Sequence, residues 1–236
     1  MTALLLKLSG EALGGENGFG IEPDILRQLT RDIGALIDAG SKVAVVLGGG
    51  NIFRGQALAA NGLDRVAGDR MGMLATVMNG LACSDFLHQA GVANQVYSAV
   101  GISGVVAGYD RNIARAAMQR GEVVILCGGT GNPYFTTDTA ACLRGIELGV
   151  DVVVKATNID GVYNADPKVD PDATRFDTIT YDEVVRRELA VMDLTAIVLC
   201  KENDMPLVVC DINAPNALVE IARGSTVGTR VVKSTT

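Results

Sequence analysis

Short apolar runs rich in β-branched residues alternate along the chain with segments whose apolar residues recur every three or four positions. The runs at residues 2–8, 42–47, 123–126 and 151–155 predict buried strands. Weaker strand patterns occupy residues 92–100, 105–106, 206–210 and 227–232, and residues 170–178 have the composition of a polar loop. Helical periodicity predicts helices at residues 23–40, 68–90, 110–120, from 137 onward, 182–189, 195–203 and 216–223.

This alternation is typical of an α/β fold, a three-layer αβα arrangement in which helices cover both faces of a mostly parallel sheet. The 236 residues suffice for one such domain. A glycine-rich or polar turn follows each of four predicted strands, at residues 7–10, 48–54, 128–138 and 155–166. Because the carboxyl ends of parallel strands lie along one edge of a sheet, we expect these turns to converge on one crevice.

The turn at residues 128–138 has the features of an anion site. Its glycines at 128, 129 and 131 allow backbone N–H groups to face a ligand, and the start of the following helix attracts phosphate. A βα turn without a ligand is the alternative interpretation. Polar side chains favour a ligand site: Thr130, Asn132, Thr136, Thr137 and Asp138.

Two cations lie beside such turns. Lys7 ends the first strand and precedes Ser9 and Gly10, which is the arrangement of a phosphate clamp, although a solvated strand-end lysine is equally consistent. Arg54 follows three successive glycines and can bind phosphate through two parallel hydrogen bonds. The alternative there is a purely structural turn.

Other candidate residues have two interpretations each. Tyr163 is able to stack on a base, with Asn158 and Asp166 hydrogen-bonding a ring edge and a ribose, or this segment is a set of simple turns. Asp69 either caps the long helix or accepts ribose hydroxyls. The methionine-rich stripe of that helix is predicted to be core or subunit interface rather than cofactor site.

Composition excludes several function classes. A net charge of -7 argues against non-specific binding to nucleic acid or to an anionic membrane. The apolar run at the N-terminus is too short for a signal peptide or a membrane span. The five scattered cysteines suit free thiols in a reducing cytosol, and the single histidine, His88, lacks zinc-ligand spacing and is expected at the surface.

Six motifs, in order and spacing, carry a resemblance: KLSGEAL, GGGNIFRG, GDRMGMLATVMNGLA, GTGNPYFTTDTAA, KATNIDGVY followed by ADP, and VMDLTA. Over essentially its whole length the chain resembles the bacterial uridylate kinases, which have the amino-acid-kinase fold. The resemblance implies transfer of the ATP γ-phosphoryl group to UMP in pyrimidine biosynthesis, with Mg²⁺ held mainly by the nucleotide phosphates. It also implies a cytoplasmic homohexamer, with a UMP-binding lobe at about residues 1–150 and an ATP-binding lobe at about 151–236.

The resemblance assigns roles position by position. It places against the ATP phosphates Lys7, Leu8, Ser9 and Gly10, with Gly50 and Arg54 at the point of transfer. It assigns to the adenosine Thr157, Asn158, Tyr163 and Asp166. It assigns to UMP Gly49, Asp69, Thr130, Gly131, Asn132, Pro133, Tyr134, Phe135, Thr136 and Thr137. The implied catalytic group is Lys7, Arg54, Asp138 and Asp193, in which the two acidic residues organise the lysine and the phosphates.

The sequence also departs from the family. Relatives activated by GTP carry basic residues where this chain has Ser84, Gln95 and Glu122, although His88 is kept, and Arg70 stands where many relatives have histidine. These replacements argue against GTP activation by that arrangement, whereas inhibition by UTP remains the expectation.

Two rival functions are weighed against this one. A carboxylate or carbamate kinase on the same fold would not require the threonine-rich turn at residues 128–138. A nucleotide-binding storage or regulatory protein that has lost the chemistry would be expected to lack Lys7, Arg54 or Asp138, and this chain has all three.

Overall fold

A single mixed sheet runs through the computed structural model, which describes residues 2–15, 18–53, 62–167 and 169–234. Within these residues nine strands are ordered β4-β3-β5-β2-β1-β6-β8-β9-β7, and every neighbouring pair is parallel except β8 and β9. The strands are β1 (Ala3–Leu8), β2 (Lys42–Leu47), β3 (Asn94–Ser98), β4 (Ala107–Gly108), β5 (Val123–Cys127), β6 (Val152–Thr157), β7 (Thr178–Thr180), β8 (Leu207–Asp211) and β9 (Thr229–Val232).

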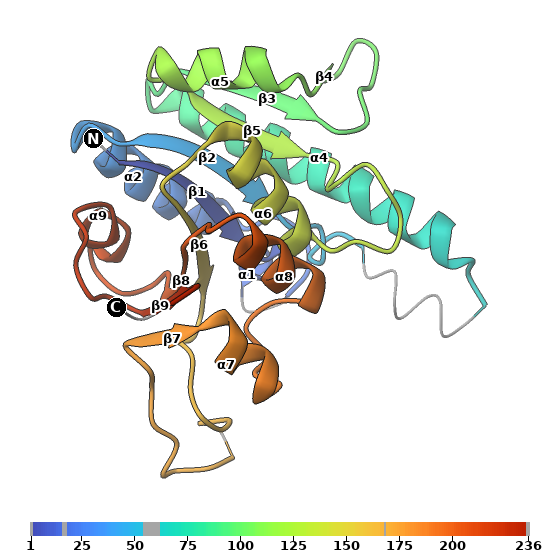
Figure 1. Ribbon diagram of the computed structural model, residues 1–236. Coiled ribbons are helices and arrows are strands. Elements are labelled where there is room, and N and C mark those ends of the chain that lie inside the picture. Colours follow the sequence, from blue (N-terminus) through green and yellow to red (C-terminus); the bar gives the residue numbers. More distant parts are fainter. Residues whose placement is uncertain (1, 16–17, 54–61, 168, 235–236) are drawn as a thin grey trace.

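Helices cover both faces of the sheet (Figure 1). They are α1 (Gly10–Leu13), α2 (Pro23–Asp38), α4 (Arg65–Gln89), α5 (Arg111–Gln119), α6 (Thr137–Leu148), α7 (Tyr181–Arg186), α8 (Leu194–Glu202) and α9 (Ala217–Ala222). Helices α2, α4 and α9 pack on one face, and α5, α6 and α8 pack on the other. Both faces need this cover because alternate side chains of a strand point to opposite faces. In β1, Leu4 and Leu6 enter the core on the α2 side, while Leu5 enters the core on the α6 side. The predicted three-layer α/β fold is confirmed.

Four adjacent parallel strands position the candidate site. Strands β5, β2, β1 and β6 are consecutive in the sheet, so the turns that follow them lie along the same edge. The register places Lys7 of β1 directly opposite Lys155 of β6. Long-range strand pairing thus brings together segments that are almost 150 positions apart in the chain.

Several short elements differ from the predictions. The loop predicted at residues 170–178 ends in β7, a strand of three residues that is too short to show a period. Residues 105–106 are not a strand, because Val106 instead pairs with Ile102 across a tight hairpin. The short helix α1 follows β1 directly and has no counterpart among the predicted helices.

The long helix begins earlier than its predicted start at residue 68. Asp64 is its N-cap and accepts a hydrogen bond from the Ala67 N–H at 3.0 Å, so α4 starts at Arg65. Asp69 therefore lies inside the helix, and the capping role considered for it is wrong. Among the described residues, no helix combines the length and the apolar character needed to cross a bilayer.

Candidate active site

Two lysines and one aspartate form a buried charged cluster at the ends of β1 and β6. The Lys7 Nζ lies 2.5 Å from Asp138 Oδ1, and the Lys155 Nζ donates to Asp138 Oδ2 at 2.9 Å. Lys7 is only 5% exposed, so its ammonium group is removed from bulk water. Burial opposes ionisation of Asp138, but the two ammonium groups outweigh it and hold the pKa of this carboxyl below its usual value.

Lys155 has no role in the sequence-based assignment, although the structure gives it the same partner as Lys7. Its ammonium group also donates to the Val191 carbonyl at 2.6 Å, which holds the group at the carboxyl-terminal edge of the sheet. A signal was present in the sequence: like Lys7, Lys155 ends an apolar strand that leads into a polar turn.

Asp193 organises the start of α6 rather than the lysine cluster. As N-cap of α8 it accepts a hydrogen bond from the Ala196 N–H at 3.1 Å. Its carboxylate also accepts from the Thr136 Oγ1 at 2.5 Å and from the Thr139 Oγ1 at 2.9 Å. Thr136 is itself the N-cap of α6. Asp193 thus holds the two helix N-termini together next to Asp138.

A reciprocal pair of buried amides positions the glycine turn after β2. Asn51 and Asn79 donate to each other's side-chain oxygens at 3.0 and 2.7 Å, and both are fully buried. Asn79 also donates to the Gly48 carbonyl at 2.7 Å. At Gly49 a Cβ would lie 2.8 Å from the Gly72 carbonyl oxygen, so only glycine permits this approach of the turn to α4.

A hollow of about 200 Å³ lies between this turn, α4 and the start of α6; we call it the α4 hollow. Its lining residues are Gly49, Gly50, Phe53, Arg65, Gly68, Asp69, Gly72, Met73, Thr76, Gly129, Phe135, Thr136 and Thr137. Backbone groups, threonine hydroxyls and one carboxylate thus meet at the N-terminus of a helix, which suits a polar, anionic ligand.

The turn after β5 closes one side of the α4 hollow. Gly128, Gly129 and Gly131 have φ values of 75°, 59° and 82°, as their role in the turn predicts. The Gly128 N–H donates to the Thr76 Oγ1 at 2.7 Å. Residues 130–133 lie next in the turn, where the Thr130 Oγ1 accepts from the Asn132 N–H at 3.1 Å. None of these four residues lines the hollow.

A second hollow, of about 480 Å³, lies beside β6, and we call it the β6 hollow. Three of its polar lining residues are Thr157, Tyr163 and Asp166, as predicted for one nucleotide, and Lys155 lies at its wall. Its apolar lining consists of Ile159, Val162, Ala165, Pro167, Leu189, Ala190, Val191 and Val209. A polar rim with apolar walls suits a ring system that carries a sugar.

The structure separates Asn158 from these residues. Asn158 lines a third hollow on the α2 side, with Leu8, Gln28 and Asp32 among its neighbours. Leu8 is buried there, and so lies away from the β6 hollow. Ser9 is the N-cap of α1 and accepts from the Ala12 N–H at 3.4 Å, while Arg54 lies outside the described residues.

The lysine cluster lies between the two main hollows. Lys155 lines the β6 hollow, and Asp138 directly follows Thr137, which lines the α4 hollow. The lining residues of the two hollows, as far as the chain is described, do not overlap. The cluster thus adjoins the β6 hollow through Lys155 and the α4 hollow through the start of α6.

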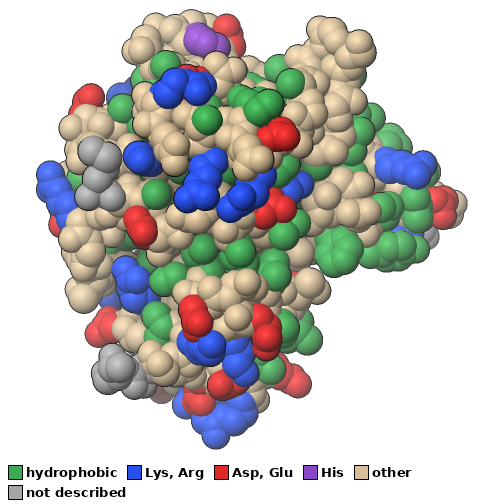
Figure 2. All heavy atoms as spheres, turned by 45° about the horizontal axis from the view of Figure 1, so that its top comes forward, with side chains coloured by type: hydrophobic (Ala, Val, Ile, Leu, Met, Phe, Trp, Pro, Cys, Tyr) green, Lys and Arg blue, Asp and Glu red, His purple; other side chains and the backbone are tan. Residues whose placement is uncertain are grey.

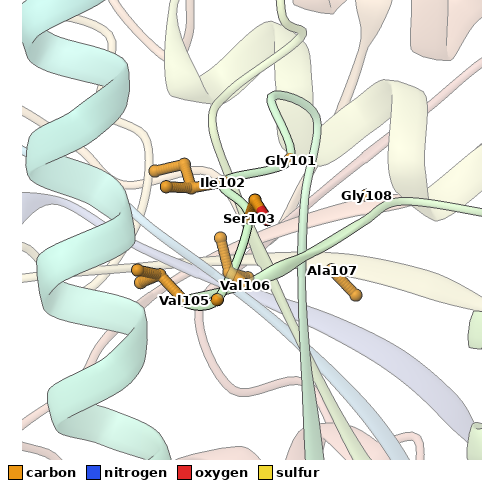
Figure 3. A pocket seen from close by; sticks show the side chains of 8 residues that line it. Gly101, Ile102, Ser103, Val105, Val106, Ala107 and Gly108 are labelled. Atoms are coloured by element: carbon orange, nitrogen blue, oxygen red, sulfur yellow. The ribbon is translucent and has the colours of Figure 1, made fainter.

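The hairpin at residues 101–108 lacks such chemistry. It borders a shallow, open hollow of about 480 Å³ whose side chains are small or aliphatic, with Ser103 supplying a hydroxyl (Figure 3). The single histidine is exposed at the surface (Figure 2), as predicted. All five cysteines are buried and free.

Comparison with known proteins decides the family. The sequence model of the Amino acid kinase family matches residues 2–211. A uridylate kinase of Alcanivorax borkumensis is 57% identical over 228 residues, which cover 97% of this chain and 90% of that protein. A uridylate kinase of Pseudomonas aeruginosa is 55% identical, over 97% of this chain and 93% of its own length. The chain belongs to the uridylate kinases of the amino acid kinase family.

Solved structures agree with this membership. The UMP kinase of Bacillus anthracis superposes with a TM-score of 0.96 at 33% identity, over 99% of this chain and 97% of that one. The UMP kinase of Ureaplasma parvum gives a TM-score of 0.92 at 36% identity, over 98% and 99%. As a uridylate kinase family member the chain is an enzyme, a phosphotransferase, and the lysine cluster between its two hollows is its candidate active site.

Proposed function

We propose that this enzyme transfers the γ-phosphoryl group of ATP to UMP, giving UDP and ADP, in the synthesis of pyrimidine nucleotides. The observation that carries the proposal is the position of the Lys7–Asp138–Lys155 cluster between two separate hollows. A phosphoryl transfer between two nucleotides requires positive charge where their phosphate ends meet. The names of the relatives support the choice of acceptor.

The α4 hollow is proposed as the UMP site, within an N-terminal lobe of about residues 1–150. Asp69 would accept hydrogen bonds from the ribose, and Gly49 would let the backbone approach the nucleotide. The Thr137 N–H at the start of α6 and the Thr137 hydroxyl would face the phosphate, while the next two N–H groups are capped by the Thr136 hydroxyl. The turn at residues 130–135 would complete the site by closing over the base, which polar groups select by matching its edge.

The β6 hollow is proposed as the adenosine site, within a C-terminal lobe of about residues 151–236. Tyr163, Thr157 and Asp166 would contact the base and the ribose, and the apolar walls would exclude water from the ring. Asn158 lines the hollow on the α2 side, so we do not include it in the proposed adenosine site. The ATP phosphates would extend from here over Lys7, Ser9 and Gly10 towards Gly50.

The chemistry requires little from the protein beyond charge and position. The attacking group is a phosphate oxygen of UMP that is ionised near neutral pH, because the second pKa of a phosphate monoester is about 6. No strong general base is therefore needed, and the transfer would be in line and direct, without a covalent enzyme intermediate. Lys7 and Lys155 would neutralise the charge of the transferred group, with Arg54 as a further cation.

Mg²⁺ fits this site as an ion held by phosphates. Each oxygen of Asp138 already contacts an ammonium group, so a metal ion bound to this carboxylate would be repelled by Lys7 and Lys155. Mg²⁺ commonly binds one or two carboxylates at most and completes its shell with phosphate oxygens and water. When bound it would neutralise charge on the phosphates that Lys7 faces.

Regulation, assembly and location complete the proposal. UTP would inhibit by occupying the UMP site, whereas activation by GTP through the basic arrangement of relatives is not expected, because Ser84, Gln95 and Glu122 stand at those positions. The five free, buried cysteines fit a reducing cytoplasm. Exposed apolar side chains of α4, among them Met71, Leu74 and Met78, fit association into a homohexamer.

An assay of ADP release tests the proposal. Purified enzyme with ATP and Mg²⁺ is given UMP, CMP, dUMP, a carboxylate or no acceptor. We expect rapid ADP release with UMP and at most weak release with the others. Release without any acceptor, or a preference for the carboxylate, would contradict the assignment.

A further inference from the structure

The carboxylate of Asp69 joins α4 to the turn that closes the α4 hollow. It accepts the Tyr134 N–H at Oδ2, at 2.7 Å, across 65 positions of sequence. Both of its oxygens also accept from the Arg65 Nε, at 2.9 Å each. Arg65 lies one helical turn before Asp69, so the two side chains share a face of α4.

Arg65 also contacts Tyr134 directly, through the tyrosine ring. Its guanidinium carbon lies 5.4 Å from the centre of the Tyr134 ring, within the range of a cation–π contact. Tyr134 is 67% exposed, so burial does not fix its ring. Its φ of 72° lies in the left-handed region that side chains other than glycine rarely adopt. A strained, exposed residue keeps this conformation only when neighbouring groups hold it.

Tyr134 directly precedes a wall of the α4 hollow. The next three residues, Phe135, Thr136 and Thr137, all line this hollow, and Asp138 of the lysine cluster comes directly after them. Arg65 and Asp69 line the same hollow from α4. A displacement of Tyr134 would therefore move the wall that faces the acceptor.

We propose that Arg65 is a positioning residue for the acceptor nucleotide, acting through Asp69 and Tyr134. It orients the Asp69 carboxylate and holds Tyr134 so that residues 135–137 form the wall of the acceptor site. This inference rests on the proposed function for the identity of the acceptor, but not for the contacts themselves.

The first experiment separates binding from chemistry. Arg65→Gln is expected to raise the KM for UMP by about three- to thirtyfold, the combined effect of losing a half-exposed ion pair and a cation–π contact, with kcat and the KM for ATP within about threefold. Arg65→Lys keeps the charge but not the planar guanidinium, so it should not restore the KM. A KM for UMP in Arg65→Gln within about twofold of wild type would overturn the proposal, since the loss of both contacts costs more.

Arg27→Gln is the matched control. Arg27 also pairs with an aspartate one turn away, Asp24, and lies 5.9 Å from the centre of an aromatic ring, that of Phe86. It lines neither the α4 hollow, the β6 hollow nor the hollow on the α2 side. Its loss should leave all kinetic constants unchanged.

A double variant distinguishes positioning from direct contact with the nucleotide. If Arg65 acts through Tyr134, the effects of Arg65→Gln and Tyr134→Ala on the KM for UMP will not multiply in the double variant. Effects that multiply would mean that Arg65 acts without the Tyr134 ring, through Asp69 alone or by touching the nucleotide itself, and would overturn the proposal.

Proteolysis gives a readout that does not depend on the reaction. Chymotrypsin cleavage after Tyr134 or Phe135, identified by fragment mass, is expected to be about tenfold faster or more in Arg65→Gln than in wild type, because the turn is released. Unchanged cleavage would contradict the proposal. Wild-type enzyme that cannot phosphorylate UMP, yet shows this difference in cleavage, would contradict the proposed function and leave the role of Arg65 in holding the turn intact.

Discussion

Lys7 and Lys155 stand opposite each other on neighbouring parallel strands and share one carboxylate, that of Asp138. Each oxygen of Asp138 binds one ammonium group, so the three side chains carry a net charge of one cation in a nearly dry site. This arrangement fixes both ammonium groups before any ligand arrives. Groups fixed in advance stabilise developing charge without having to reorganise during the reaction.

Removal of Lys7 should stop the reaction and leave the fold intact. Lys7→Ala is expected to lower kcat by about 10²–10³-fold or more, the range for loss of one preorganised charged donor. Asp138 would still be paired with Lys155, which limits the structural damage. The measurement is the steady-state rate together with the circular dichroism spectrum, and the control is Lys201→Ala, which removes an exposed ion pair with Asp182. Near-normal activity of Lys7→Ala would remove Lys7 from the mechanism.

Loss of Lys155 should affect the donor nucleotide more than the acceptor. Lys155 lines the β6 hollow and not the α4 hollow. Lys155→Met, which keeps the length of the side chain, is expected to lower kcat by about tenfold or more and to raise the KM for ATP but not that for UMP. Initial rates over a grid of both nucleotides give the two constants. A rise in the KM for UMP alone would contradict the assignment of Lys155 to the donor site.

Asp138 should stabilise the fold in a pH-dependent way. Its pKa is lowered from 3.8 in the folded protein, so its contribution is present above that value and is lost as the pH falls through the folded pKa. Asp138→Asn leaves the buried ammonium group of Lys7 and the partly buried one of Lys155 without a carboxylate partner, and we expect it to cost about 3 kcal/mol of unfolding free energy at pH 7.

Urea unfolding at pH 7, 5 and 3 measures this dependence. The difference between wild type and Asp138→Asn should be similar at pH 7 and 5 and smaller at pH 3. Asp182→Asn, which removes an exposed partner of Lys201, is the control and should change stability by less than about 1 kcal/mol. A difference that grows as the pH falls would contradict the assigned pairing.

Asp69 should distinguish the two nucleotides. Asp69→Ala removes a carboxylate that lines the α4 hollow and also releases the Tyr134 N–H. We expect the KM for UMP to rise by about a hundredfold, with a far smaller change for ATP. Asp85→Ala, which removes an exposed carboxylate elsewhere on α4, is the matched control. Equal rises in the KM for UMP and the KM for ATP would contradict the assignment of Asp69 to the UMP site.

The buried amides of Asn51 and Asn79 should be needed for the acceptor site. Asn79→Leu fills a similar volume but leaves the Asn51 amide and the Gly48 carbonyl without these partners. Each unsatisfied buried group costs about 1–3 kcal/mol, so we expect a clear fall in the melting temperature and weaker UMP binding. Calorimetric unfolding and UMP titration measure the two effects. Unchanged UMP affinity would show that the Gly48–Gly50 turn does not depend on this pair.

The strands and turns around the site can be predicted because their signals are local. Continuous apolar runs mark β1, β2, β5 and β6, and the residues after them are glycine or polar. These turns converge because the four strands are adjacent and parallel, and the carboxyl ends of parallel strands lie at one edge of the sheet. Lys7 is recognisable in this way, from its place at the end of a strand.

The features that escape prediction depend on contacts between distant segments. No local pattern shows that Lys155 stands opposite Lys7, because register is a property of the assembled sheet. The same holds for Asn158, which follows Thr157 directly but lines a hollow with α1 and α2. The predicted start of α4 is three residues late. A glycine followed by an aspartate, as at Gly68 and Asp69, is typical of a helix start, but the N-cap is Asp64.

The two hollows have separate walls, and this affects the order in which the two nucleotides can bind. If the two nucleotides bind in these hollows as proposed, neither is expected to block the entry of the other, because no described residue lines both. Such a geometry permits random-order addition through a ternary complex. Double-reciprocal plots for one nucleotide at several fixed levels of the other should therefore intersect rather than run parallel.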